Sequence, residues 1–252
     1  MRDVKKTNSD SRPLKIGILY PLHSAEDDYP RLAAALDPQA DVHIVHTDSP
    51  NVHEIEASRV TGRQEILAEG ARQLREIKVD VCMWACTSGS FAFGLDGART
   101  QAEALGNEVG VPASSTSIAF LHALQVLKLE KIAVAATYPE RHSAFFSEFL
   151  REGGIHVLKT SSLGLWSADD VALVEKAEVL HFAAANDHHE AEAIIIPDTA
   201  LHTAAFLEEL EQQAGKTVLT ANQVTMWEAL RLGGYGVPQK NLGRLMNALN
   251  SR

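Results

Sequence analysis

Short apolar runs alternate along the chain with stretches in which apolar residues recur every three or four positions. The apolar runs predict strands at residues 14–20, 41–47, 79–85, 131–137, 155–161, 191–197 and 217–221. The helical periodicity is clearest over residues 62–77, 139–154 and 199–215, and the last two stretches end on glycine, as helices often do. Strands alternating with helices are typical of a parallel sheet covered by helices on both faces, so we expect an α/β fold.

The order of these elements repeats weakly along the chain. Residues 14–111 and 131–221 each run strand, helix, strand, helix, strand, loop. Two similar α/β halves facing one another would create a cleft, and clefts at domain interfaces commonly bind small ligands. We predict that residues 14–115 with 222–252 form one half and residues 116–221 the other, after a polar, flexible leader at residues 1–13.

Composition and charge limit the classes of molecule that the protein is expected to bind. The 252 residues are 45% hydrophobic, which suffices for a substantial core. The net charge of −10 disfavours nucleic acid and an anionic membrane surface as partners, because both need a basic face. No apolar run approaches the roughly 20 residues of a membrane span, and the first dozen residues lack the apolar centre of a signal peptide. We therefore expect a cytoplasmic protein that acts on a small molecule.

Polar side chains collect where the predicted strands end. In open α/β sheets, ligands bind beyond the carboxyl ends of the strands. Four of these ends carry a thiol, hydroxyl, carboxylate or amide, namely Cys86-Thr87-Ser88-Gly89-Ser90, Thr137-Tyr138, Asp198-Thr199 and Asn222-Gln223. We expect these side chains to meet in one small polar pocket.

Each of these residues also has a purely structural interpretation. Asp and Asn at a strand-to-helix junction are preferred N-caps, worth about 1 kcal/mol each, so Asp198 and Asn222 are equally well explained as caps. Cys82 has apolar neighbours and is predicted to be a small core residue. Cys86 differs because hydroxyl residues and a glycine follow it directly. A thiol at a helix N-terminus is expected to have a lowered pKa.

No cofactor or metal site is expected. His188 and His189 are adjacent, so they point apart and lack the spacing of metal ligands. The GGYGVP segment at residues 233–238 does not lie between a strand and a helix, as a dinucleotide-binding glycine motif does. The nucleophile-elbow and P-loop patterns do not occur in the sequence. With two cysteines, a disulfide scaffold is not expected either.

Taken in order, these motifs resemble the aspartate/glutamate racemase superfamily. The thiol-hydroxyl motif, Thr137-Tyr138, TALHT (199–203) and TANQVTMWEALRL (220–232) are most similar to the arylmalonate decarboxylase and maleate cis-trans isomerase branch. DTALHT (198–203) also resembles a segment of relatives encoded with ectoine utilisation. The resemblance implies two α/β halves related by a pseudo-twofold axis, an active site between them, no cofactor, and carbanion or enediolate chemistry next to a carboxylate. The YPLHSAEDDYPRL segment (20–32) departs from the isomerases, which have a polar Ser-Asn-type loop there.

The resemblance also assigns roles to two reactive side chains. Racemases and maleate isomerases of this kind use two cysteines, one from each half, whereas arylmalonate decarboxylases keep only the second. Cys86 matches the first position, but Asp198 occupies the second. This implies that Cys86 is the nucleophile or one acid/base group, and that Asp198 is the opposite acid/base group if burial raises its pKa.

The remaining predicted site residues match positions that bind the substrate. Thr87, Ser88 and Tyr138 match groups that hydrogen-bond its carboxylate. Backbone N–H groups around Thr87 and Thr199 would assist, since each preorganised donor to an enediolate can be worth roughly 3 kcal/mol. Asn222 and Gln223 match a loop that lines the same cleft in maleate isomerases.

Several functions stay open at this point. The leading hypothesis is a cofactor-independent isomerase or racemase acting next to a carboxylate of a small dicarboxylate or amino acid. The alternatives are a decarboxylase of malonate-type acids, in which Cys86 delivers the proton, and a non-catalytic carboxylate-binding protein. The simplest alternative is purely structural: Cys86 is a buried, unreactive thiol, and Asp198 only caps a helix. The family pattern also favours a homo-oligomer.

Overall fold

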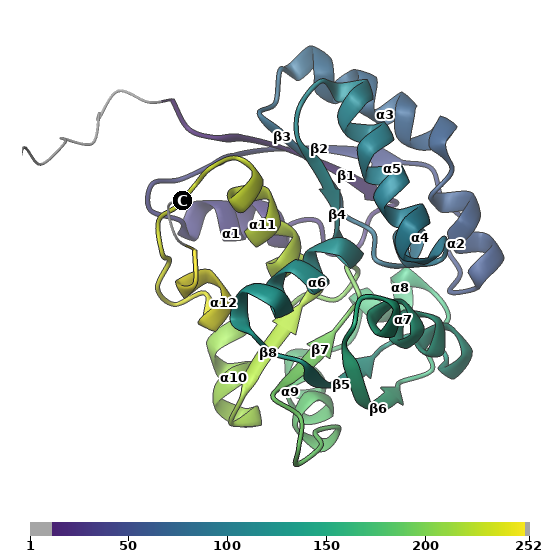
Figure 1. Cartoon of the computed structure of the whole chain (residues 1–252), viewed down its shortest axis with the longest axis vertical. Coiled ribbons are helices and arrows are strands. Elements are labelled where there is room, and N and C mark those ends of the chain that lie inside the picture. The colour runs from purple at the N-terminus through teal and green to yellow at the C-terminus, as the bar shows by residue number, and fades with distance from the viewer. Residues whose placement is uncertain (1–11, 250–252) are drawn as a thin grey trace, which may run out of the picture.

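The computed structural model describes residues 12–249 and contains two parallel β-sheets flanked by helices (Figure 1). The first sheet has the strand order β2-β1-β3-β4 and the second β6-β5-β7-β8. The strands are β1 (Lys15–Pro21), β2 (Asp41–Thr47), β3 (Val81–Trp84), β4 (Ala113–Ser115), β5 (Lys131–Ala136), β6 (His156–Ser162), β7 (Ala193–Ile196) and β8 (Thr217–Thr220). The two sheets therefore share one topology, and the predicted α/β fold with two similar halves is confirmed. Most of the predicted leader lies outside the described residues.

Helices cover the sheets on both faces. They are α1 (Asp28–Ala35), α2 (Ile55–Thr61), α3 (Gln64–Ile77), α4 (Ser88–Phe91), α5 (Gly94–Val109), α6 (Thr116–Leu127), α7 (Glu140–Glu152), α8 (Ala168–Ala172), α9 (Lys176–Ala185), α10 (Leu207–Ala214), α11 (Ala221–Leu232) and α12 (Gly243–Asn247). Helices α3 and α5 share a buried apolar cluster with one face of the first sheet, and α9 and α10 with one face of the second. Within residues 12–249, every helix is too short or too polar to cross a membrane.

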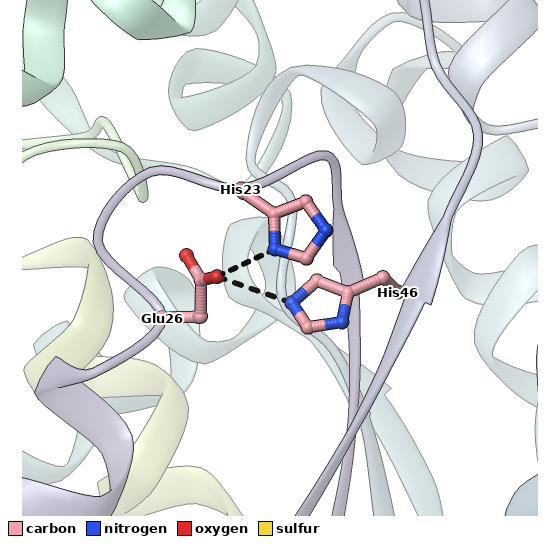
Figure 2. Close-up of side chains that lie close together, drawn as sticks. All are labelled: His23, Glu26 and His46. Atoms are coloured by element: carbon pink, nitrogen blue, oxygen red, sulfur yellow. Dashed lines mark hydrogen bonds and ion pairs between the residues drawn. The ribbon is translucent and has the colours of Figure 1, made fainter.

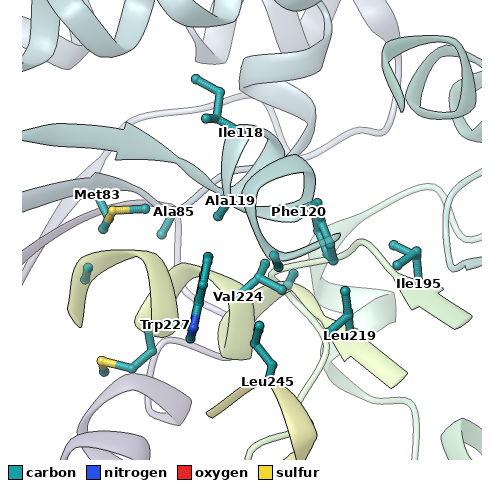
Figure 3. Packing of buried hydrophobic residues seen from close by; sticks show 14 of the residues in the cluster. Met83, Ala85, Ile118, Ala119, Phe120, Ile195, Leu219, Val224, Trp227 and Leu245 are labelled. Carbon is teal, nitrogen blue, oxygen red and sulfur yellow. The ribbon is translucent and has the colours of Figure 1, made fainter. Parts of the chain in front are cut away.

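A third apolar cluster joins the two sheets. It contains side chains from β3, β7 and β8 together with helices α6 and α11, which lie between the sheets (Figures 1 and 3). Strands β3 and β7 are buried along their whole length, as central strands of parallel sheets are. Because both halves contribute to one core, the carboxyl ends of the strands in the two sheets are held at fixed positions relative to one another. The domain boundaries given above stay a prediction, since α11 packs on strands of both sheets.

Two details of the predicted elements were wrong. Strand β4 was not predicted, because a three-residue Ala-Ser-Ser strand carries no apolar pattern. The predicted helix over residues 199–215 begins only at Leu207, and turns and bends precede it. The backbone N–H groups of Thr203 and Ala204 donate to a carboxylate oxygen of Asp28, at 2.9 and 3.1 Å, instead of to carbonyls one helical turn earlier.

This late helix start also corrects the predicted caps. Asp198 does not precede a helix, and its Oδ1 accepts the N–H of Ala200 at 3.0 Å in a local turn. Asn222 lies inside helix α11, whose N-cap position is held by Thr220. Neither residue is therefore explained by helix capping, so their burial needs another reason.

Candidate active site

The carboxyl ends of the central strands of the two sheets are tied together. Thr87, which follows β3, donates its hydroxyl to the carbonyl of Pro197, which follows β7. Tyr138, which follows β5, donates its hydroxyl to the same carbonyl at 3.0 Å. A pocket of about 480 Å³, including its open mouth, lies at this junction. Its lining includes five of the eight predicted site residues, namely Cys86, Ser88, Tyr138, Asp198 and Thr199.

Cys86 is positioned at the point where β3 meets the short helix α4. Its Sγ accepts the backbone N–H of Gly89 at 3.2 Å and lies 3.7 Å from the Ser88 hydroxyl oxygen. A Cβ atom at position 89 would lie only 3.1 Å from Sγ and 3.0 Å from the Trp84 ring. The absence of a side chain at Gly89 therefore permits the close approach of its N–H to the sulfur.

The pKa of Cys86 differs from the prediction. Burial raises it to about 11, although the N–H of Gly89 and the Ser88 hydroxyl act to lower it, and the negative charge of Asp198 raises it further. The helix that follows is only one turn long, and the thiol is 5% exposed, so desolvation exceeds the effect of the few N–H groups. Cys86 is consequently a thiol, not a thiolate, at neutral pH.

Asp198 enters the same pocket from the end of the second sheet. Its side chain is 4% exposed, and one carboxylate oxygen, Oδ2, accepts the hydroxyl of Thr137 from the end of β5. The other oxygen, Oδ1, accepts the Ala200 N–H described above. These donors fix the orientation of the carboxylate, whose negative charge is one of the factors that raise the Cys86 pKa.

His53 is a third ionisable group in the pocket, and the strand ends considered in the sequence did not include it. It lies on the loop after β2, and its Nε2 is 3.9 Å from Oδ2 of Asp198. Its Nδ1 donates to the carbonyl of Leu165 at 3.0 Å, so in the neutral ring Nε2 carries a lone pair. Nε2 of His53 and the carboxylate of Asp198 therefore face each other in the pocket. The sequence feature that could have indicated His53 is the polar DSPNVH segment (48–53), which follows the second predicted strand.

Aromatic rings enclose the imidazole of His53. The Tyr138 ring meets it edge to face, with the centroids 4.9 Å apart, and the His142 ring stacks on it at 5.8 Å. Burial raises the pKa of Tyr138 well above its usual value, and the charges of Asp198 and Cys86 act in the same direction. Tyr138 is therefore a neutral hydroxyl whose proton is directed to the protein backbone.

Three predicted residues lie outside the pocket lining. The Thr87 side chain joins the two sheets, as described, and its carbonyl accepts the Ser117 hydroxyl at 2.7 Å. Asn222 is completely buried, and its Nδ2 donates to the Thr199 carbonyl at 3.2 Å behind the pocket wall. Gln223 donates to the Leu242 carbonyl at 2.8 Å. The hydrogen bonds of these three residues support roles in keeping the walls of the pocket in position.

A pocket between two α/β sheets, lined by a few convergent polar groups, is typical of proteins that bind or convert small molecules. The family model of arylmalonate decarboxylase matches residues 22–246, so the chain belongs to the arylmalonate decarboxylase family. The curated arylmalonate decarboxylase of Bordetella bronchiseptica is 26% identical over 189 residues, which are 73% of this chain and 78% of that protein. A maleate isomerase of Pseudomonas putida is 26% identical over 167 residues, 64% of this chain and 67% of that protein.

Solved structures show the same fold. A maleate isomerase from Pseudomonas putida, crystallised with maleate, superposes with a TM-score of 0.88 at 19% identity, covering 96% of this chain and all of that one. A liganded arylmalonate decarboxylase variant gives a TM-score of 0.83 at 23% identity, covering 93% and 98%. The predicted resemblance to this branch is confirmed, and the relatives named are isomerases and decarboxylases, in agreement with the expectation of an enzyme.

Proposed function

We propose that the protein is a cofactor-independent isomerase or racemase that moves a proton at the carbon next to the carboxylate of a small substrate. The observation that carries this proposal is the placement of Cys86 from one half and Asp198 from the other in the lining of one pocket, with His53 of the first half beside Asp198. Proton transfer through a carbanion needs one acid and one base within reach of the same carbon. The chain provides two such groups that differ in kind.

The protonation state of Cys86 suggests its role. Because burial raises its pKa to about 11, Cys86 is protonated in the free protein and can act as the proton donor to a carbanion. The Asp198–His53 pair then accepts the proton from carbon. Donors at the oxygens of the resulting enediolate stabilise it, and the Ser88 hydroxyl lines the pocket for this purpose. Attack of a thiolate on a double bond is less favoured, since it needs Cys86 to be deprotonated first.

Decarboxylation of a malonate-type acid is the alternative, and the matching family supports it. Loss of CO2 leaves the same kind of enediolate, which then needs only a proton donor. The Cys86 thiol could supply that proton without the help of Asp198. The two proposals therefore differ in whether the carboxylate is required.

Solvent deuterium exchange tests the proposal. Aspartate, glutamate, diaminobutyrate, maleate and an α-substituted malonate are incubated with the protein in D2O, and deuterium next to the carboxylate is measured by NMR. We expect exchange into one substrate class, reduced about 100-fold or more in both Cys86→Ser and Asp198→Asn. Cys82→Ala is the matched control, because this second cysteine is buried in the core of the first sheet.

The outcomes separate the alternatives. Release of CO2 from the malonate, with activity retained in Asp198→Asn, would indicate the decarboxylase. Thermal stabilisation by a carboxylate without exchange or turnover in any substrate would indicate a binding protein and contradict the proposal. Equal activity of Cys86→Ser and the parent protein would contradict it as well.

A further inference from the structure

A second cluster of ligand-type side chains lies beside strands β1 and β2 (Figure 2). His23 and Glu26 are on the loop after β1, and His46 is on β2. Both imidazole rings direct a nitrogen at the same carboxylate oxygen, Glu26 Oε1, with distances of 2.9 Å from His23 Nδ1 and 3.2 Å from His46 Nε2. The three ligand atoms all lie within 4.8 Å of one another.

These distances are compatible with a shared metal ion. Ligands bound at about 2.0–2.1 Å are about 3.3 Å apart in a tetrahedral site and about 2.9 Å apart in an octahedral one. The two nitrogen-to-oxygen distances, 2.9 and 3.2 Å, fall in this range. The two nitrogens lie within 4.8 Å of each other, so a cation beside Oε1 of Glu26 could bring all three ligand atoms into its coordination sphere.

The protein holds these ligands in place before any ion binds. The second carboxylate oxygen of Glu26 accepts the backbone N–H of Ser24 at 2.7 Å, which leaves Oε1 for the cluster. His46 is paired in register with Tyr20 of the neighbouring strand, and its ring packs edge to face on the tyrosine ring. The rings of His23 and His46 lie against one another, with centroids 3.8 Å apart. Such support reduces the entropy that metal binding would cost.

We propose that His23, Glu26 and His46 form a site for a divalent first-row transition-metal ion, with zinc as the representative. Two imidazole nitrogens and one carboxylate oxygen are ligands that zinc prefers, whereas calcium and magnesium need more oxygens. Three protein ligands leave at least one position for water. His23 is 74% exposed at its side chain, so the affinity is expected to be micromolar, weaker than that of a closed four-ligand site.

The site is distinct from the candidate active site but shares a segment with it. Tyr20, Leu22 and Ser24 line the pocket, whereas His23 and Glu26 belong to the metal cluster. The backbone N–H of Ser24 donates to Oε2 of Glu26 at 2.7 Å, which links the two groups of residues. A bound ion would fasten this segment to β2 and so restrict one wall of the pocket. The sequence does not reveal the cluster, because His46 is 20 positions from Glu26.

Metal binding to the untagged full-length chain tests the proposal. Zinc binding is measured by equilibrium dialysis, in a Cys86→Ser background so that the pocket thiol does not compete, and cobalt absorption reports the ligand geometry. We expect one zinc ion per chain, and at least tenfold weaker binding in His46→Ala and in Glu26→Gln. The double variant His188→Ala/His189→Ala removes two neighbouring histidines elsewhere, with rings 4.6 Å apart, and should bind zinc like the parent.

Two results would overturn this assignment. One is the absence of stoichiometric zinc binding by the parent. The other is equal affinity in the parent and in a His46→Ala variant whose thermal unfolding shows that it is folded. A loss of binding in the His188→Ala/His189→Ala variant alone would place the ion at that pair and would likewise overturn the proposal.

Discussion

His142 places an imidazole ring in the core beneath the candidate active site. Neither ring nitrogen has a hydrogen-bond partner within residues 12–249, and the ring packs against His53, Phe91 and Tyr138. Burial, assisted by the nearby His53, lowers the pKa of His142 to about 3. The His142 ring is therefore uncharged at neutral pH, and its packing against the His53 ring helps to hold that ring in place.

This burial predicts a pH dependence of stability. Between the ordinary histidine pKa of 6.5 and the folded value of about 3, the unfolded chain binds a proton that the folded chain does not. Stability from this group is thus present above pH 6.5 and falls by about 1.4 kcal/mol per pH unit below it. His142→Phe should show a shallower fall, measured by urea unfolding at a series of pH values from neutral to acidic. Parallel curves for the two proteins would contradict this account.

At the scale of residues, the sequence predicted where the reactive groups lie better than how they behave. Cys86 and Asp198 were predicted to share a pocket because both follow buried strands, and that rule depends only on the parallel sheet. The raised pKa of Cys86 was not predictable, because it depends on how completely distant segments exclude water. His53 was missed because its loop reaches the pocket only when both halves are folded.

One buried network holds the helices around the pocket. Asp28 on α1 accepts hydrogen bonds from the N–H groups of Thr203 and Ala204 and from Asn222 on α11, the last at 3.1 Å. The Oδ1 atom of Asn222 accepts the Tyr29 hydroxyl at 3.0 Å. Two helices and the irregular segment before α10 are thereby joined through a single amide side chain.

Removal of that amide should destabilise the fold. Asn222→Ala removes the acceptor of the buried Tyr29 hydroxyl and one of the donors to Asp28 and to the Thr199 carbonyl, and a buried polar group left unsatisfied costs about 1–3 kcal/mol. We expect the free energy of unfolding to fall by about 2–4 kcal/mol in urea titrations. Gln73→Ala on the exposed face of α3 is the control and should change stability by less than about 0.5 kcal/mol. A value for Asn222→Ala as small as that of the control would show that the network contributes little.

Local and long-range interactions explain why the sequence predicted some elements better than others. The seven predicted strands match observed strands, and the prediction is easiest for the central strands such as β3 and β7, because buried parallel strands are continuous apolar runs. The helix predicted over residues 199–215 is wrong at its start, since Asp28 and Asn222 from distant elements hold residues 199–204 in turns. Local periodicity contains no information about such long-range partners.

At the scale of the whole molecule, loops from the two halves close over the pocket. The backbone N–H of His53 donates to the Trp166 carbonyl at 2.7 Å, and Oδ1 of Asn51 accepts the Ala168 N–H at 2.8 Å. Asn51 and Ala168 both line the pocket. These contacts connect the loop before α2 with the start of α8 and the loop before it, and we expect them to limit access to Cys86.

Loosening this closure should expose the thiol. We expect slow iodoacetamide labelling of Cys86 in the parent, because the thiol is protonated and buried, and labelling at least severalfold faster in Asn51→Ala. Mass spectrometry of the labelled peptide distinguishes Cys86 from Cys82. Asn107→Ala, at an exposed position of α5, is the control and should label like the parent. Equal rates in all three proteins would mean that the contact to Ala168 does not limit access.

A thiol on one side of the pocket and a carboxylate with an imidazole beside it on the other would make the two faces of a bound substrate chemically unequal. For a racemisation the equilibrium constant is one, so kcat/KM must be equal for the two enantiomers whichever groups carry the proton. The two enantiomers can therefore differ in kcat and in KM taken separately, but not in the ratio kcat/KM. Because Cys86 rests as a thiol, the free protein is prepared for the enantiomer whose proton leaves toward Asp198. Each turnover, in either direction, exchanges which of the two groups carries the proton, so the pocket must exchange protons with water before it can convert the same enantiomer again.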